Sequence, residues 1–150
     1  MQLSFKIPEL DREMTQAAVE QALEEYRLYN TITLDEREAS ITAGYNERFH
    51  GPTNTTSDQT ANIAIHNVDK AAARWAYCER LERAVRRLHP KERLLIEERY
   101  MKEDYVYDWV VYQQRFNPPI SAGTYSKIRW KAFYKLALTL DIAVEKTSND

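Results

Sequence analysis

The chain has 150 residues, of which 43% are hydrophobic and 29% are charged, and its formal net charge is −2 at pH 7. This length suits one domain whose core needs neither a disulfide nor a structural metal, and the composition excludes wholesale disorder. No signal-peptide pattern opens the chain, no run of about 18 apolar residues occurs, and Cys78 is a lone cysteine. We therefore expect a cytoplasmic protein that does not enter a membrane.

The charges are divided unevenly along the chain. Residues 1–60 carry 5 Lys and Arg against 11 Asp and Glu, whereas residues 61–150 carry 16 against 12. Between positions 121 and 140 there are four basic side chains and no acidic one. A basic end of this kind is the best electrostatic candidate for a phosphate-binding surface.

The first predicted element is an amphipathic helix over residues 11–29. Its apolar positions recur at helical spacing, and Asp11 or Thr15 is the expected N-cap: Val19, Leu23, Tyr26 and Tyr29. From residue 30 to residue 60 the periodicity fades, and Gly44, Gly51 and Pro52 favour a flexible connector. We therefore place a domain boundary at residue 60, with the N-terminal helix and connector before it.

A long central helix is predicted over residues 61–88. Its apolar stripe steps by three or four residues: Val68, Ala72, Trp75, Cys78, Leu81, Val85 and Leu88. At about 1.5 Å per residue it spans roughly 40 Å, which leaves room for self-association, although packing within one chain explains the stripe equally well. A homodimer is therefore one open alternative.

The C-terminal part is predicted to contain three further helices. Pro90 disfavours helix in the residue before it and suits the first turn of a new one. Asp104 is the expected cap of a helix over residues 105–115, which the Asn117-Pro118-Pro119 segment ends. Ser121 then caps a last helix that reaches about Leu140, so the predicted fold class is all-α.

The last two helices have the features of a helix-turn-helix, in which the second helix enters the major groove of DNA. On a helical wheel the apolar side is expected to pack on the preceding helices: Tyr125, Ile128, Ala132, Phe133 and Leu136. The other side carries Thr124, Lys127, Lys131 and Lys135. The full set of predicted DNA-binding residues is Ser121, Gly123, Thr124, Tyr125, Lys127, Arg129, Lys131 and Lys135, with Tyr125 at the border and Arg129 near the core edge.

Each of these residues has an expected role. Thr124 and Lys127 suit contacts with base edges, and Tyr125 lies at the border of this side. Lys131 and Lys135, further along, suit phosphate. Gly123 lets the start of the helix approach the DNA backbone, while Arg129 suits either a phosphate or an acidic neighbour. Trp130 lies off the main apolar side and is either a second packing surface or a dimer contact.

The sequence offers little to an enzyme. Only three glycines are present, so no phosphate-binding glycine loop or dinucleotide fingerprint exists, and His50, His66 and His89 lack metal-ligand spacing. Asp104 and Asp108 are one turn apart, but capping and solvation explain them better than acid–base chemistry. We expect no cofactor, no metal and no catalytic activity.

Several segments resemble known families. Residues 88–93 (LHPKER) with 98–101 (ERYM) are similar to the start of the helix-turn-helix in region 4 of sigma factors. More closely, the chain resembles the ArpU family of phage transcriptional regulators, chiefly through residues 131–137 (KAFYKLA), and also through 15–19 (TQAAV) and 65–69 (IHNVD). This resemblance implies a regulator of phage late genes, an activator that binds double-stranded promoter DNA together with host RNA polymerase.

Two other readings stay open at this stage. In one, the protein is an interaction module that binds polymerase or another phage protein without recognising DNA, through Trp130, Tyr134 and the acidic first helix. In the other, it is a phage packaging protein that binds DNA for structural purposes.

Overall fold

The computed structural model describes residues 7–44 and 58–147, and it confirms the all-α class. In this part of the chain there is no strand, only an isolated antiparallel bridge between Leu10 and Glu145. The helices, of which η1 and η2 are π-helical, are α1 (Arg12–Gly44), α2 (Asp58–Arg86), α3 (Pro90–Ile96), η1 (Glu97–Met101), α4 (Asp108–Val110), η2 (Val111–Arg115) and α5 (Ala122–Thr139). None of the helices in the described ranges is both long and apolar enough to cross a bilayer.

Helix α1 begins where the sequence predicts but ends much later. The Asp11 carboxylate caps it by accepting a hydrogen bond from the backbone N–H of Met14 at 3.0 Å. The prediction of a connector from residue 30 is wrong as far as Gly44, because the helix continues and contacts α2 through Glu36 and Arg37. The rest of that connector, residues 45–57, lies outside the described residues, and α2 begins at Asp58.

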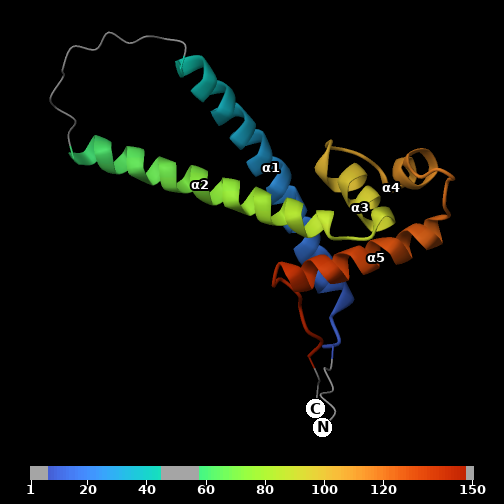
Figure 1. The fold of residues 1–150 in the computed structure, drawn as a ribbon. Coiled ribbons are helices and arrows are strands. Elements are labelled where there is room, and N and C mark those ends of the chain that lie inside the picture. Colours follow the sequence, from blue (N-terminus) through green and yellow to red (C-terminus); the bar gives the residue numbers. More distant parts are fainter. Residues whose placement is uncertain (1–6, 45–57, 148–150) are drawn as a thin grey trace.

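Helices α1 and α2 cross and then diverge, as Figure 1 shows. Near the crossing, the Tyr77 hydroxyl donates to the carbonyl of Ala22 at 2.8 Å, and the Tyr26 hydroxyl donates to Glu82 at 2.7 Å. Farther out, Glu36 pairs with Arg74, and the Arg37 guanidinium lies 3.7 Å from the ring centre of Trp75. The outer part of the predicted stripe is not buried, since Val68 is exposed.

One hydrophobic core joins α1, α2, α3 and α5. Its members from α1 and α2 include Val19, Leu23, Leu81 and Val85, and its largest fully buried side chain is Phe133 of α5. Burying side chains of this size is the main stabilising term of such a fold. The first helix therefore shares its core with the segments after residue 60.

The predicted break before Pro90 is confirmed. Pro90 is the first residue of α3, and the His89 ring caps that helix by accepting a hydrogen bond from the Lys91 N–H at 3.2 Å. In return, the Glu92 carboxylate accepts from the His89 N–H at 3.2 Å, which completes a capping box.

The predicted cap at Asp104 is wrong. Helix α4 begins at Asp108 with Tyr107 before it, and Asp104 instead forms an ion pair of 3.0 Å with Arg27 of α1. Tyr105, which follows Asp104 directly, has a φ of 61°, a value that a bulky side chain seldom adopts. The chain therefore cannot continue as a helix from Asp104. The Asn117–Pro118 peptide bond, which is cis, lies in the turn after η2.

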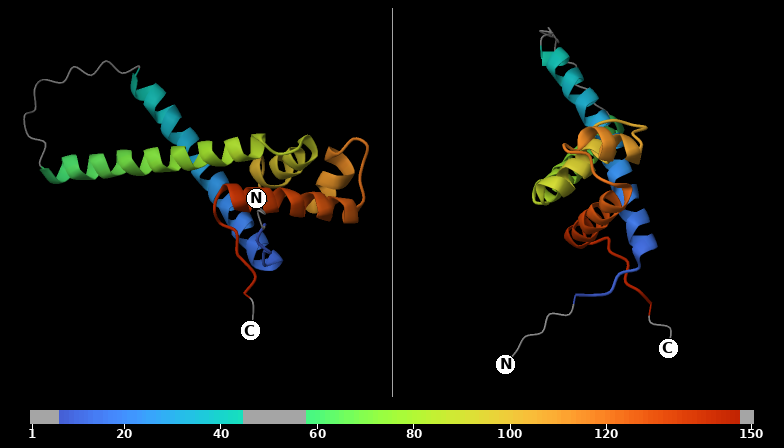
Figure 2. Two further views of the ribbon diagram at one scale, coloured as in Figure 1. Left: turned by 60° about the horizontal axis from the view of Figure 1, so that its bottom comes forward. Right: turned by 90° about the vertical axis from the view of Figure 1, so that its right-hand side faces the viewer.

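Helix α5 runs across α1 beneath α3 and α4, and the segment between η1 and α4 passes over the opposite side of α3 (Figures 1 and 2).

The two ends of the described chain lie side by side. The Asp11 N–H donates to the Val144 carbonyl at 2.8 Å, and the Lys146 N–H donates to the Glu9 carbonyl at 3.0 Å. This clamp holds the base of α1 next to the end of α5.

Candidate nucleic-acid interface

The first turn of α5 is built as the sequence predicts. The Ser121 side chain is the N-cap and accepts a hydrogen bond from the backbone N–H of Thr124 at 3.1 Å. Its hydroxyl also donates to the Thr124 hydroxyl at 3.0 Å. Both side chains are exposed, and the Thr124 hydroxyl keeps its own proton free for a hydrogen-bond acceptor outside the chain.

The two faces of α5 differ sharply in burial. The predicted apolar face is confirmed, because Tyr125, Ala132, Phe133 and Leu136 are buried and Ile128 is half-buried. The opposite face is exposed at Thr124, Lys127, Lys131 and Lys135. Helix α5 therefore presents one hydroxyl and three ammonium groups along a single stripe.

Two predicted DNA-binding residues turn inward instead. Tyr125 is buried and donates its hydroxyl hydrogen bond to Asp108 at 2.8 Å, so its expected place at the edge of the DNA-facing side is corrected. Arg129 takes the second of its two expected roles, since its guanidinium lies 3.2 Å from the other Asp108 oxygen. The same Asp108 carboxylate accepts from Arg99 of η1 at 2.8 Å.

Asp108 therefore fixes α5 to the helices before it. Burial by itself would raise the pKa of this carboxyl, but the hydrogen bonds from Tyr125 and Arg99 and the charge of Arg129 outweigh it, so its pKa lies below the ordinary value. Burial, followed by the hydrogen bond to Asp108, raises the pKa of the Tyr125 hydroxyl, which stays protonated. The sequence predicts capping or solvation for Asp108, whereas in the structure its carboxylate contacts Arg99, Tyr125 and Arg129.

Lys135, another predicted DNA-binding residue, also forms an ion pair with a carboxylate. Its ammonium lies 2.6 Å and 3.0 Å from the two oxygens of Glu92, whose side chain is 5% exposed. Lys127 and Lys131 differ from it, because neither forms an ion pair with any residue whose side chain the structure describes. The charges available to an external anion on α5 are therefore those of Lys127 and Lys131.

Gly123 lies in the exposed first turn of α5. A Cβ atom placed on it would meet only the Ser121 hydroxyl oxygen, at 4.0 Å. Packing within the chain thus does not require a glycine here, which leaves close approach by an external molecule as a reason for one.

Trp130 and Tyr134 serve packing within the chain. The Arg12 guanidinium lies 5.0 Å from the ring centre of Trp130, and the Tyr134 ring contacts Trp130 edge-on at 6.1 Å between centres. The Tyr134 hydroxyl donates to the Pro8 carbonyl at 3.4 Å. Of the two roles expected for Trp130, the structure shows packing within the chain.

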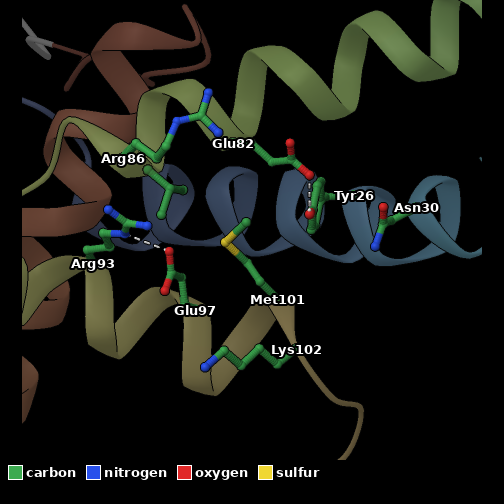
Figure 3. A pocket seen from close by; sticks show the side chains of 9 residues that line it. Tyr26, Asn30, Glu82, Arg86, Arg93, Glu97, Met101 and Lys102 are labelled. Carbon is green, nitrogen blue, oxygen red and sulfur yellow. Dashed lines mark hydrogen bonds and ion pairs between the residues drawn. The ribbon is translucent and has the colours of Figure 1, made fainter.

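A separate hollow lies between α1, α2 and the continuous segment of α3 and η1 (Figure 3). Four of its polar side chains form two pairs, since Arg93 contacts Glu97 at 2.7 Å and Tyr26 contacts Glu82 at 2.7 Å. Across the described ranges, no three His, Cys, Asp or Glu side chains come together as a metal site would need. In the hollow the exposed Arg86 lies beside these paired side chains, whereas α5 presents Lys127 and Lys131 one turn apart on one face.

Comparison with known proteins places the chain beside a phage protein. It is 25% identical over 153 residues to an uncharacterized phage-related protein of Listeria innocua serovar 6a, a match that covers 97% of this chain and 100% of that protein. No protein-family model matches the chain. No solved structure matches it either. The chain is thus similar to a phage-related protein along nearly its whole length.

Proposed function

We propose that this protein is a sequence-specific DNA-binding regulator of transcription rather than an enzyme, and that α5 is its reading helix. The observation that carries the proposal is the exposed stripe of Thr124, Lys127 and Lys131 on a helix whose other face is buried in the core. A capped helix held rigidly at a surface is the element that helix-turn-helix proteins insert into the major groove.

The chemistry of this stripe suits duplex DNA. Lys127 and Lys131 have no ion-pair partner among the described residues, so binding a phosphate breaks no salt bridge. Thr124 and Lys127 lie in the first two turns, from which side chains reach base edges, while Lys131 lies one turn further on. Asp108 keeps Arg129 and Tyr125 on the inner side, which orients the stripe outward.

The proposed biological role rests on resemblance. Short segments of the sequence, chiefly residues 131–137, resemble the ArpU family of phage regulators, and the chain is 25% identical to a phage-related protein of Listeria innocua serovar 6a. We therefore propose that the DNA is a promoter of phage late genes, for packaging or lysis, and that the protein activates it with host RNA polymerase in the bacterial cytoplasm.

The test is a selection of bound fragments from the phage genome by the purified chain, followed by salt titration of the best fragment. We expect one site ahead of late genes, and we expect Lys127→Ala and Lys131→Ala each to lower the salt slope of binding by about 0.9. Lys102→Ala is the matched control, because Lys102 is exposed but paired with Glu98 at 2.6 Å, at the end of η1. A specific site that binds both α5 variants as tightly as the native chain contradicts the proposal.

A second candidate function, a protein-interaction module, is favoured by three exposed aromatic side chains between residues 105 and 109. Tyr105, Tyr107 and Trp109 are 94%, 66% and 47% exposed, and they lie on and beside the segment that passes over α3 on the side away from α5. Tyrosine and tryptophan are the residues that most often dominate the binding energy of protein interfaces. We propose these three side chains as the interaction surface in place of Trp130 and Tyr134, which pack within the chain.

The two functions are separable by mutation. A Tyr105→Ser/Tyr107→Ser variant removes two exposed rings without touching α5. If the interaction module is the main function, this variant no longer retains purified RNA polymerase in a pull-down, while the native chain shows only weak, sequence-blind binding to DNA. Retention of polymerase by the variant at the native level contradicts this second candidate.

A further inference from the structure

A shallow hollow lies between the start of α3 and the exposed face of α5. His89, Lys91 and Glu92 line it from α3, and Thr124, Lys131 and Lys135 are among the residues that line it from α5. The hollow therefore borders directly on the stripe that we propose as the DNA-reading surface, and its α3 side was not among the residues predicted from the sequence.

The acidic member of this hollow is already neutralised. Glu92 is nearly buried, both of its oxygens contact the Lys135 ammonium, and one of them also accepts from the His89 N–H. Lys91 and Lys131 are exposed, and none of the carboxylates whose side chains the structure describes forms an ion pair with either. The hollow thus keeps two unpaired positive charges, which favours an anion.

His89 adds a hydrogen-bond donor to these charges. Its Nδ1 accepts a hydrogen bond from the Lys91 N–H at 3.2 Å, so the neutral ring carries its proton on Nε2. The ring is exposed, and with Nδ1 occupied by the cap its Nε2–H is the donor left for an external acceptor.

We propose that His89, Lys91 and Lys131 bind a phosphate of the DNA backbone beside the groove that α5 occupies. This inference rests on the proposed DNA-binding function and deepens it, because it moves one backbone contact from Lys135 to the start of α3. Lys135 holds Glu92 in place and is a positioning residue. The contact is independent of base sequence, as contacts with phosphate are.

The experiment measures the binding of the full chain to a short duplex of mixed sequence by fluorescence anisotropy, over a range of salt concentrations. We expect Lys91→Ala to weaken binding several-fold and to lower the salt slope by about 0.9, as Lys127→Ala does. His89→Asn keeps a side-chain oxygen for the cap but cannot reach the phosphate, so it should also weaken binding. Lys102→Ala is the control, and thermal unfolding checks that each variant is folded.

Three outcomes decide between the proposals. If Lys91→Ala and His89→Asn weaken binding and Lys102→Ala does not, the phosphate contact is supported. If Lys91→Ala binds like the native chain while Lys127→Ala is weakened, the contact at α3 is overturned and the reading helix stands. If the native chain binds neither the mixed duplex nor any selected fragment, the DNA-binding function itself is overturned.

Discussion

The Lys135 ammonium lies 2.6 Å from an oxygen of Glu92, the carboxylate that also closes the capping box of α3. Lys135→Met leaves this nearly buried charge without its partner. Half of the Lys135 side chain is exposed, so water can partly take the place of its ammonium beside Glu92. We therefore expect the free energy of unfolding to fall by about 1–2 kcal/mol. Denaturant unfolding measures this loss.

Lys131→Met is the matched control for that change, because Lys131 lies one turn earlier on the same helix without an ion pair in the described part of the chain. We expect its stability to stay within about 0.5 kcal/mol of the native chain. Adding Glu92→Gln to Lys135→Met should recover part of the loss, since glutamine also completes a capping box. Equal stability of the two lysine variants would show that the Glu92 pair contributes nothing.

Local signals predicted most of the helix boundaries. Asp11, Pro90 and Ser121 act through short-range capping and backbone geometry, and all three begin helices as expected. The buried face of α5 was predicted as well, because its period of 3.6 residues is visible in the sequence.

Interactions between distant residues decided what the sequence did not show. Helix α1 continues past residue 30 although its apolar period fades, and contacts such as Arg37 on Trp75 hold that part against α2. The helical wheel places Tyr125 at the border of the DNA-facing side and leaves two roles open for Arg129. Asp108, which lies 17 and 21 residues earlier, holds both side chains on the inner side. No pattern within one helix predicts a partner at that separation.

Ser121 allows the cap of α5 to be separated from its proposed contact with DNA. Ser121→Ala removes the acceptor for the Thr124 N–H and should cost about 1 kcal/mol of stability. Ser121→Asp keeps an N-cap of similar quality but adds a negative charge at the DNA-facing surface, so stability should be retained while DNA affinity falls. Thermal unfolding and anisotropy test the two effects, and unchanged affinity in Ser121→Asp would remove this end of α5 from the interface.

Substitution of Gly123, unlike that of Ser121 by alanine, is predicted to raise the stability of the fold. An added Cβ meets no atom closer than 4.0 Å, and alanine favours helix over glycine, so Gly123→Ala should stabilise the fold by about 0.5–1 kcal/mol. If the start of α5 approaches the DNA backbone closely, the same methyl group should weaken binding to the selected fragment. A variant that is more stable and binds as tightly as the native chain would contradict the close approach.

The network around Asp108 predicts how stability depends on pH. The groups that face this carboxylate are Arg99 of η1 with Tyr125 and Arg129 of α5, and together they hold its pKa below the ordinary value. A carboxyl whose pKa is lowered on folding stabilises the native state above its unfolded pKa, which is about 3.9. That contribution is lost as the pH falls through the lower folded pKa.

Asp108→Asn removes the charge and does not titrate, so the difference in unfolding free energy between it and the native chain isolates this effect. We expect a loss of about 1–2 kcal/mol at pH 7, reduced from that of a fully buried pair because the Asp108 side chain is 40% exposed. The difference should stay constant down to about pH 4 and then shrink on further acidification, as the native carboxylate is protonated. Urea unfolding of both chains across this range is the measurement, and a difference that already grows as the pH falls toward 4 would mean that the folded pKa is raised instead.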